Sequence, residues 1–146
     1  MVEHGLVAKD KLGRLIPKSL VGDIRVLGSV QAGMPTFAEE QDLDTVNLND
    51  FLVEDTSKVY LLTVSGDSMI EAGIHEGDLV LVEKCNQAKV GEIVVARIDG
   101  DWTLKYLRQK NSCYYLEPAN KNYSDIYPEA EMEIGGVVKG VIRKYD

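Results

Sequence analysis

Two residues in the second half of the chain have types that could perform catalysis together. Ser68 lies in SGDSMIEAGIHEGDLVLVEK, residues 65–84, among small and acidic residues just before a run of aliphatic ones. A catalytic serine needs a base, and the two histidines, His4 and His75, stand in no recognisable nucleophile motif. A lysine can serve instead when burial lowers the pKa of its ammonium group. Lys105, within DWTLKYLRQ, is the lysine that the sequence offers for this role.

The residues around Lys105 predict a partly apolar environment. In a strand, side chains alternate between the two faces. This alternation puts Thr103 and Leu107 on the same face as Lys105. An ammonium group on such a face loses hydration, which favours its neutral form.

The elements that must position these residues are short strands. From Val59 onward, apolar runs alternate with turn-forming Gly, Asp, Asn and Pro: VYLLTVSG, DLVLVEK, GEIVVARID, DWTLKYLRQ, CYYLEPA and GGVVKGVIRKYD. Short strands with short connections predict a mainly β fold, either a sandwich or a partly open barrel. Gly77 and Asp78 are expected to form the turn before the strand at Leu79–Val82.

The first part of the chain has a different pattern. GLVAKD and GRLIPKS predict a small hairpin turned at Lys11–Gly13, after the end of a helix. Residues 21–58 alternate apolar with acidic, turn-rich stretches and predict an exposed connector with a short amphipathic helix at Val46–Leu52. Connectors of this length are usually functional or disordered.

Composition limits the partners and the location. A chain of 146 residues with 45% hydrophobic content can form one compact domain with a short appendage. The net charge of -8 argues against a body that binds nucleic acid by bulk electrostatics, so any DNA contact must be local. Cys85 and Cys113 are too few for a disulfide framework, and no apolar run predicts a signal peptide or membrane span. We therefore expect a cytoplasmic protein without a membrane anchor.

Three motifs, in order and spacing, resemble the LexA/UmuD family of self-cleaving serine peptidases, which use a Ser-Lys dyad. The first motif in the chain is the segment GSVQAGMP. The second is SGDSM followed by G-x-x-x-G-D, and the third is the T-x-K strand. The resemblance implies that Ser68 is the nucleophile and Lys105 the general base. It also places the scissile bond between Ala32 and Gly33, small residues that leave the carbonyl uncrowded.

The resemblance implies further parts of the site and the fold. Ser65 is a rival nucleophile, but the Ser-Met pair matches the family at Ser68. The backbone N–H groups of Asp67 and Ser68 are the implied oxyanion donors. The implied fold is a mainly β, LexA/signal-peptidase-like pseudo-barrel of short, mostly antiparallel strands with a flexible N-terminal cleavage segment. The implied chemistry needs no cofactor and no metal.

The resemblance divides the chain into three parts. Residues 1–20 resemble the helix end and wing hairpin of a winged helix-turn-helix, residues 21–58 are the linker and cleavage-site segment, and residues 59–146 are the peptidase and dimerisation domain. Recognition helices are absent from the sequence, so the chain is either a truncated or fragmentary LexA-type repressor or a short UmuD-like protein. The Ala-Gly bond, VARID, GVIR and the wing remnant favour LexA, whereas the length favours UmuD.

The function implied by the LexA branch is an SOS-response autopeptidase. A RecA filament on single-stranded DNA would stimulate cleavage of the Ala32–Gly33 bond and so relieve transcriptional repression. The chain would form a homodimer and would bind operator DNA only through a helix-turn-helix largely missing here. In the UmuD alternative, the same cleavage activates a subunit of an error-prone Y-family DNA polymerase. A third alternative is a non-catalytic dimerisation module; signal peptidases also use Ser-Lys chemistry but need a membrane anchor.

Overall fold

The computed structural model describes residues 7–9, 15–17, 23–26, 32 and 45–146. The chain forms two compact units, Met1–Glu54 and Asp55–Asp146. No helix in the described part of the chain is both long and apolar enough to cross a membrane.

The first unit contains an antiparallel strand pair at the position of the predicted hairpin. β1 (Val7–Lys9) pairs antiparallel with β2 (Leu15–Pro17). Proline has no backbone N–H, and it stands here at the end of a strand that has a single partner, where one donor fewer is tolerated. The turn at Lys11–Gly13 and the preceding helix end lie outside the described residues.

A second strand pair leads into the only helix with α geometry among the described residues. β3 (Asp23–Arg25) pairs antiparallel with β4 (Thr45–Asn47), and α1 (Leu48–Leu52) follows directly. The sequence predicted a helix over Val46–Leu52, so α1 starts later than expected. The reason is that the first of these residues is β-branched and pairs in β4, after which Asn47 caps the helix by accepting a hydrogen bond from a backbone N–H at 3.2 Å.

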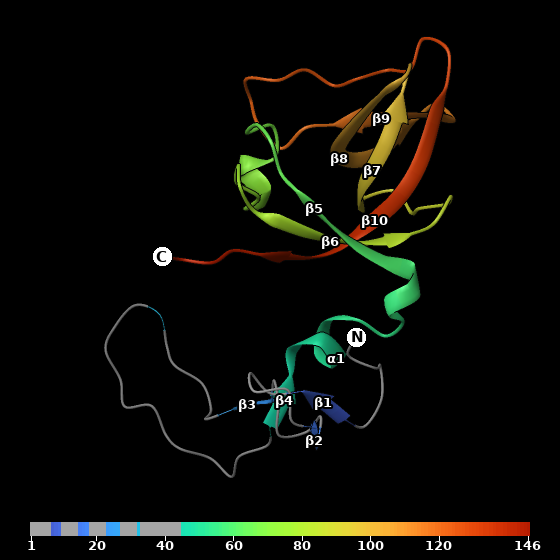
Figure 1. The fold of residues 1–146 in the computed structure, drawn as a ribbon. Helices are drawn as coiled ribbons and strands as arrows, with labels where there is room; N and C mark the ends of the chain where they lie inside the picture. The colour runs from blue at the N-terminus through green and yellow to red at the C-terminus, as the bar shows by residue number, and fades with distance from the viewer. Residues whose placement is uncertain (1–6, 10–14, 18–22, 27–31, 33–44) are drawn as a thin grey trace. The chain divides into compact units, whose positions relative to one another are not determined.

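The second unit is built on one six-stranded sheet (Figure 1). Its strands, in order across the sheet, are β5 (Val59–Thr63), β6 (Leu79–Lys84), β10 (Met132–Ile142), β7 (Ile93–Ile98), β8 (Asp101–Lys110) and β9 (Cys113–Glu117). Every neighbouring pair is antiparallel. β5 and β9 form the two edges, so this sheet does not close into a barrel. The predicted mainly β fold of antiparallel strands is confirmed.

The sheet is buried on both faces at β7. Val94 and Val95 are adjacent in sequence, point to opposite faces, and belong to two separate hydrophobic cores. Val94 packs in one core with Leu107 and Leu116, whereas Val95 packs in the other with Met69. This explains why the segment IVVARI starts with consecutive apolar residues instead of alternating ones.

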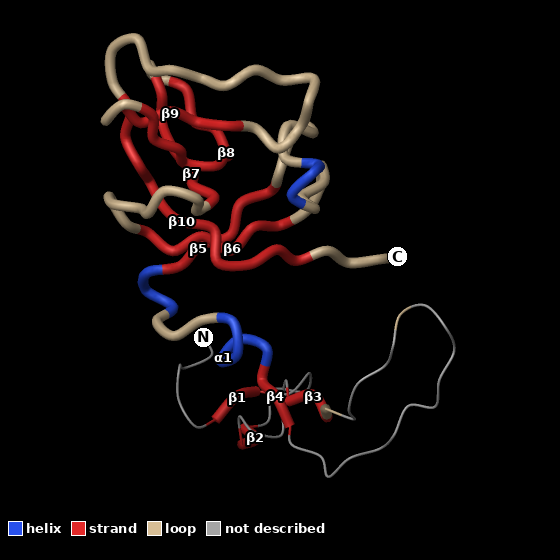
Figure 2. The backbone as a smooth tube through the Cα atoms, turned by 180° about the vertical axis from the view of Figure 1, so that it is seen from behind, coloured by secondary structure: helices blue, strands red, loops and turns tan. Residues whose placement is uncertain are grey.

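β10 is the last strand of the chain, yet it enters the middle of the sheet (Figures 1 and 2). Gly136 and Val137 pair with β6 on one side and with β7 on the other. A side chain at Gly136 would overlap Val82 and would lie 2.8 Å from the carbonyl oxygen of Glu83, so the close approach requires glycine. After Val137 the strand pairs with β6 alone, so residues 138–142 keep one open edge.

Candidate active site

The loop between β5 and β6, residues 64–78, carries Ser68, and we call it the serine loop. Gly66 has a φ of 86°, which lets the chain turn sharply just before Ser68. Ser68 is half-buried, while the next residue, Met69, is 2% exposed and packs in the core below. The 3-10 helix η3 (Ile70–Ala72) follows, and the second short 3-10 helix, η2 (Thr56–Lys58), precedes β5. The Ser-Met pair therefore anchors the loop through Met69 and leaves the serine hydroxyl at the cavity.

Ser68 and Lys105 line the same cavity. It has a volume of about 250 Å³, and its walls come from the end of β5, the serine loop, β7 and β8. Trp102 and Thr103 of β8 also line it, as does the rival nucleophile Ser65. The fold thus brings the two residues singled out by sequence into one small site.

Lys105 is buried without a carboxylate partner. It is 7% exposed, and no ion pair found within the described residues includes it. Its Nζ donates a hydrogen bond to Thr103 Oγ1 at 2.7 Å, which agrees with the predicted shared strand face. Burial lowers the pKa of Lys105 below its ordinary value of 10.5, because the ammonium group loses hydration. The neutral amine, which can accept a proton, is therefore more populated than it is in water.

The backbone at Ser68 offers two free donors. Within residues 45–146, the N–H groups of Asp67 and Ser68 donate no hydrogen bond. The carbonyl groups of the same residues are both engaged: Asp67 O accepts from the N–H of Ile70 at 3.2 Å, and Ser68 O accepts from the N–H of Ala119 at 2.8 Å. Adjacent unpaired N–H groups are able to stabilise an oxyanion.

An ion pair that the sequence analysis missed fastens the end of the serine loop. Asp78 is 3% exposed and receives two hydrogen bonds from Arg143, Nε to Oδ1 and Nη2 to Oδ2, each at 2.7 Å. The same Nη2 donates to the carbonyl oxygen of Gly73 at 2.8 Å, just after η3. Gly77 and Asp78 do form the predicted turn before β6, with Gly77 at a φ of 91°. The G-x-x-x-G-D motif was the available signal, but nothing in it indicates the distant arginine.

The pair predicts how stability responds to acid. Hydrogen bonds from Arg143, and next the N–H of His75, hold the pKa of Asp78 at about 2 instead of 3.8. Because the folded pKa lies below the unfolded one, this contribution to stability is complete above about pH 4 and is lost as pH falls towards 2. We expect Asp78→Asn to lower the Tm at pH 7 by roughly 10 °C and to flatten this acid dependence. Thermal unfolding between pH 2 and 7 checks it, with the exposed Asp101→Asn as control; equal Tm values for both variants would contradict the prediction.

The predicted scissile bond lies at the limit of the described residues. Ala32 is exposed in a bend of the first unit, and Gly33 lies outside the described residues. The assignment of the bond therefore remains a prediction from the sequence motif.

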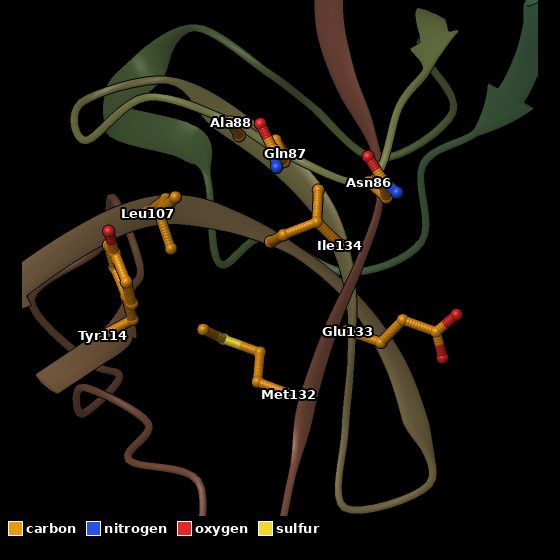
Figure 3. A pocket seen from close by; sticks show the side chains of 8 residues that line it. All are labelled: Asn86, Gln87, Ala88, Leu107, Tyr114, Met132, Glu133 and Ile134. Carbon is orange, nitrogen blue, oxygen red and sulfur yellow. The ribbon is translucent and has the colours of Figure 1, made fainter.

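A larger cavity of about 520 Å³ lies elsewhere in the second unit (Figure 3). Side chains of β8, β9 and β10, among them Leu107, Tyr114 and Met132, surround it together with the β6–β7 connection. Glu133, which contributes a carboxylate to its lining, is paired with Arg97 at 2.9 Å. The described residues that line it include neither a serine nor a lysine, so the smaller cavity with Ser68 and Lys105 is the better candidate for catalysis.

The fold and the site define a mainly β protein in which a serine and a buried lysine share one cavity. Residues 25–139 match the family model described as Peptidase S24-like, so the chain belongs to that family. The match includes the serine loop, β8 and most of β10.

Curated relatives are similar over most of this chain. A LexA repressor of Clostridium novyi is 41% identical over 132 residues, which is 90% of this chain and 64% of that protein. A LexA repressor of Clostridium perfringens is 42% identical over 123 residues, 84% of this chain and 60% of its own length. A LexA repressor of Clostridium acetobutylicum is 40% identical over 132 residues, which is 89% of this chain and 63% of that protein. The chain thus spans between 60% and 64% of the length of these relatives.

Proposed function

We propose that this chain is a self-cleaving serine endopeptidase of the LexA type. The observation that carries the proposal is that Ser68 shares a cavity with Lys105, a buried lysine that forms no ion pair with a carboxylate of the described residues. Ser68 is the nucleophile, Lys105 the general base, and the N–H groups of Asp67 and Ser68 form the oxyanion site. The match to a family described as Peptidase S24-like supports a peptidase, and the relatives named LexA repressor support the LexA type.

The proposed reaction proceeds in two steps. Neutral Lys105 takes the proton of the Ser68 hydroxyl as Oγ attacks the carbonyl carbon of Ala32, and the resulting oxyanion accepts hydrogen bonds from the free N–H groups. Lys105 then gives the proton to the amide nitrogen of Gly33 as the peptide bond breaks. A water molecule, deprotonated by Lys105, hydrolyses the ester and restores Ser68. Lys105 Nζ is hydrogen-bonded to Thr103 and not to Ser68, so the amine and the serine hydroxyl must come within hydrogen-bond reach for the reaction, as catalytic groups of unliganded sites often do.

The proposed biological role is derepression during the SOS response. Residues 59–146 act as the peptidase and dimerisation domain, residues 21–58 as linker and cleavage segment, and residues 1–20 as part of a winged helix-turn-helix. A RecA filament acts by favouring the docked, cleavable conformation, because any partner that binds that conformation better shifts the population towards it. In the UmuD alternative, the same cleavage activates a polymerase subunit. Stable binding of the cleaved chain to a Y-family polymerase would favour this alternative over a repressor.

Alkaline incubation of the purified chain tests the proposed function. High pH deprotonates Lys105, so we expect the single band on a denaturing gel to convert into two without any added partner. A non-catalytic dimerisation module would remain one band at every pH, which would refute the peptidase assignment.

We also propose that the second unit forms a homodimer through the open edge of β10. Residues 138–142 pair on one side alone, and within and after this segment Val141 is 42% and Tyr145 82% exposed. An apolar strand edge of this kind invites pairing with a second copy.

The dimer prediction is tested by sedimentation. We expect about twice the monomer mass at micromolar concentration, and we expect Val141→Lys to raise the dimer dissociation constant at least about tenfold, because a charge blocks the edge. Val90→Lys, at an exposed position between β6 and β7, is the control and should leave the mass unchanged. A wild-type chain that remains monomeric at these concentrations would contradict the proposal.

A further inference from the structure

A short stretch after β9, residues 119–123, is hydrogen-bonded to the serine loop, and we call it the clamp loop. Two of these bonds join backbone to backbone. The N–H of Ala119 donates to the carbonyl oxygen of Ser68 at 2.8 Å, and the N–H of Glu71 donates to the carbonyl oxygen of Ala119 at 2.8 Å. The clamp loop thus holds the serine loop on both sides of Met69.

Two side chains of the clamp loop converge on Asp67. Asn120 donates from Nδ2 to the carbonyl oxygen of Asp67 at 2.9 Å. Tyr123 donates from Oη to Oδ1 of Asp67 at 2.6 Å. The residue before the proposed nucleophile is therefore fixed both at its main chain and at its carboxylate.

The clamp loop is itself well anchored. At its base Leu116, which is fully buried, exchanges backbone hydrogen bonds of 2.9 and 2.8 Å with Ile126. Within the loop, Asn120 Oδ1 accepts from the N–H of Asn122 at 2.9 Å, and Asn120 O accepts from the N–H of Tyr123 at 3.1 Å. These bonds hold Asn120 in place independently of Asp67, so its side-chain amide is a pre-oriented donor.

The carbonyl group of Asp67 and the N–H group of Ser68 belong to one peptide unit. That unit is planar and trans, so its C=O and N–H point in opposite directions. A donor that holds the carbonyl from one side therefore sets the direction of the N–H on the other side. We propose that Asn120 is a positioning residue for catalysis: its amide aims the Ser68 N–H at the developing oxyanion, and Tyr123 secures Asp67 in the same arrangement.

This inference rests on the proposed function, since it gives a role to the N–H of the nucleophile. The hydrogen bond from Asn120 also polarises the peptide group, which makes the Ser68 N–H a stronger donor. Removing an oxyanion donor outright costs on the order of 10²–10³ in rate. Loss of its orientation should cost less, so we expect a fall of about ten- to a hundredfold.

The test compares variants of the full chain by two readouts, the self-cleavage rate constant from pH 7 to 10 and the rate at which a small fluorophosphonate labels Ser68. Asn120→Ala removes the donor, and Asn122→Ala, whose backbone N–H is retained, is the matched control. Tyr123→Phe removes one hydroxyl from a side chain that is 47% exposed, with Tyr127→Phe, 52% exposed, as its control. The hydrogen bond to Asp67 raises the pKa of Tyr123, so the Tyr123 hydroxyl keeps its proton and this bond over most of the range from pH 7 to 10.

We expect Asn120→Ala to lower both rates by the same factor and to leave the pH dependence unshifted, because Lys105 is untouched. Tyr123→Phe should lower both rates several-fold and provides the same test if Asn120→Ala fails to fold. Wild-type rates in the folded variants would overturn the inference, as would slower cleavage with unchanged labelling, because that would place Asn120 in docking of the cleavage segment. A wild-type chain that neither cleaves itself nor is labelled at Ser68 would instead refute the proposed function.

Discussion

Replacing either Ser68 or Lys105 by alanine should abolish self-cleavage and leave a folded chain. In the proposed mechanism the two residues act as a unit, so removal of one should cost nearly as much as removal of both, and we expect a loss of at least about a thousandfold. Lys105→Ala also removes a buried amine that has no ion-pair partner in the described part of the chain, so no carboxylate there is left uncompensated. Intact-mass measurement after alkaline incubation, together with a thermal melt of each variant, gives the result.

Two neighbouring substitutions serve as controls for the dyad. Ser65→Ala changes the other serine that lines the cavity, and Lys110→Ala changes an exposed lysine at the end of the same strand. Both should cleave at rates close to that of the wild type. If Ser65→Ala no longer cleaves itself while Ser68→Ala still does, the nucleophile is Ser65. Cleavage of Lys105→Ala at the wild-type rate would show that Lys105 is not the base.

Gly33→Val should slow self-cleavage by roughly a hundredfold or more. A β-branched residue crowds the carbonyl of Ala32 and resists a turn with positive φ, so the reacting groups would miss their alignment. The dyad is not altered by this change, so labelling of Ser68 by a fluorophosphonate should continue at the wild-type rate. This separates a damaged substrate segment from a damaged catalytic site.

Gly28→Val, in the same GSVQAGMP segment, is the matched control and should cleave normally. Mass spectrometry of the wild-type products should find a fragment that begins at Gly33. Normal cleavage of Gly33→Val, or a fragment that begins at another residue, would contradict the assigned bond.

The strands of the second unit could be predicted because their signals are local. Runs such as IVVARI and DWTLKYLRQ are bounded by turn residues, and they became β7 and β8. Alternation along β8 also placed Thr103 beside Lys105 correctly. The late start of α1 was not predicted, because the apolar periodicity at Val46 does not reveal that this residue pairs with β3.

The order of strands in the sheet and the support of the serine loop could not be predicted. The insertion of β10 between β6 and β7 depends on pairing between segments distant in sequence, about which hydrophobic patterns say nothing. The same holds for Asn120, which bonds a residue 53 positions away, and for Arg143, which pairs with Asp78 65 positions away. Both side chains would pass for ordinary surface residues in the sequence.

The pH dependence of self-cleavage tests the central claim, a serine activated by a buried lysine, most directly. In the proposed mechanism neutral Lys105 is the reactive form, so the first-order rate constant should rise about tenfold per pH unit below the pKa of Lys105 and level off above it. Because burial lowers the pKa of Lys105, the plateau should begin below the ordinary value of 10.5. Measured from pH 5 to 10 without a partner, the rate constant should increase in this way and be independent of protein concentration. A bell-shaped profile centred near pH 6 to 7 would indicate a histidine base and would contradict the Ser68–Lys105 assignment.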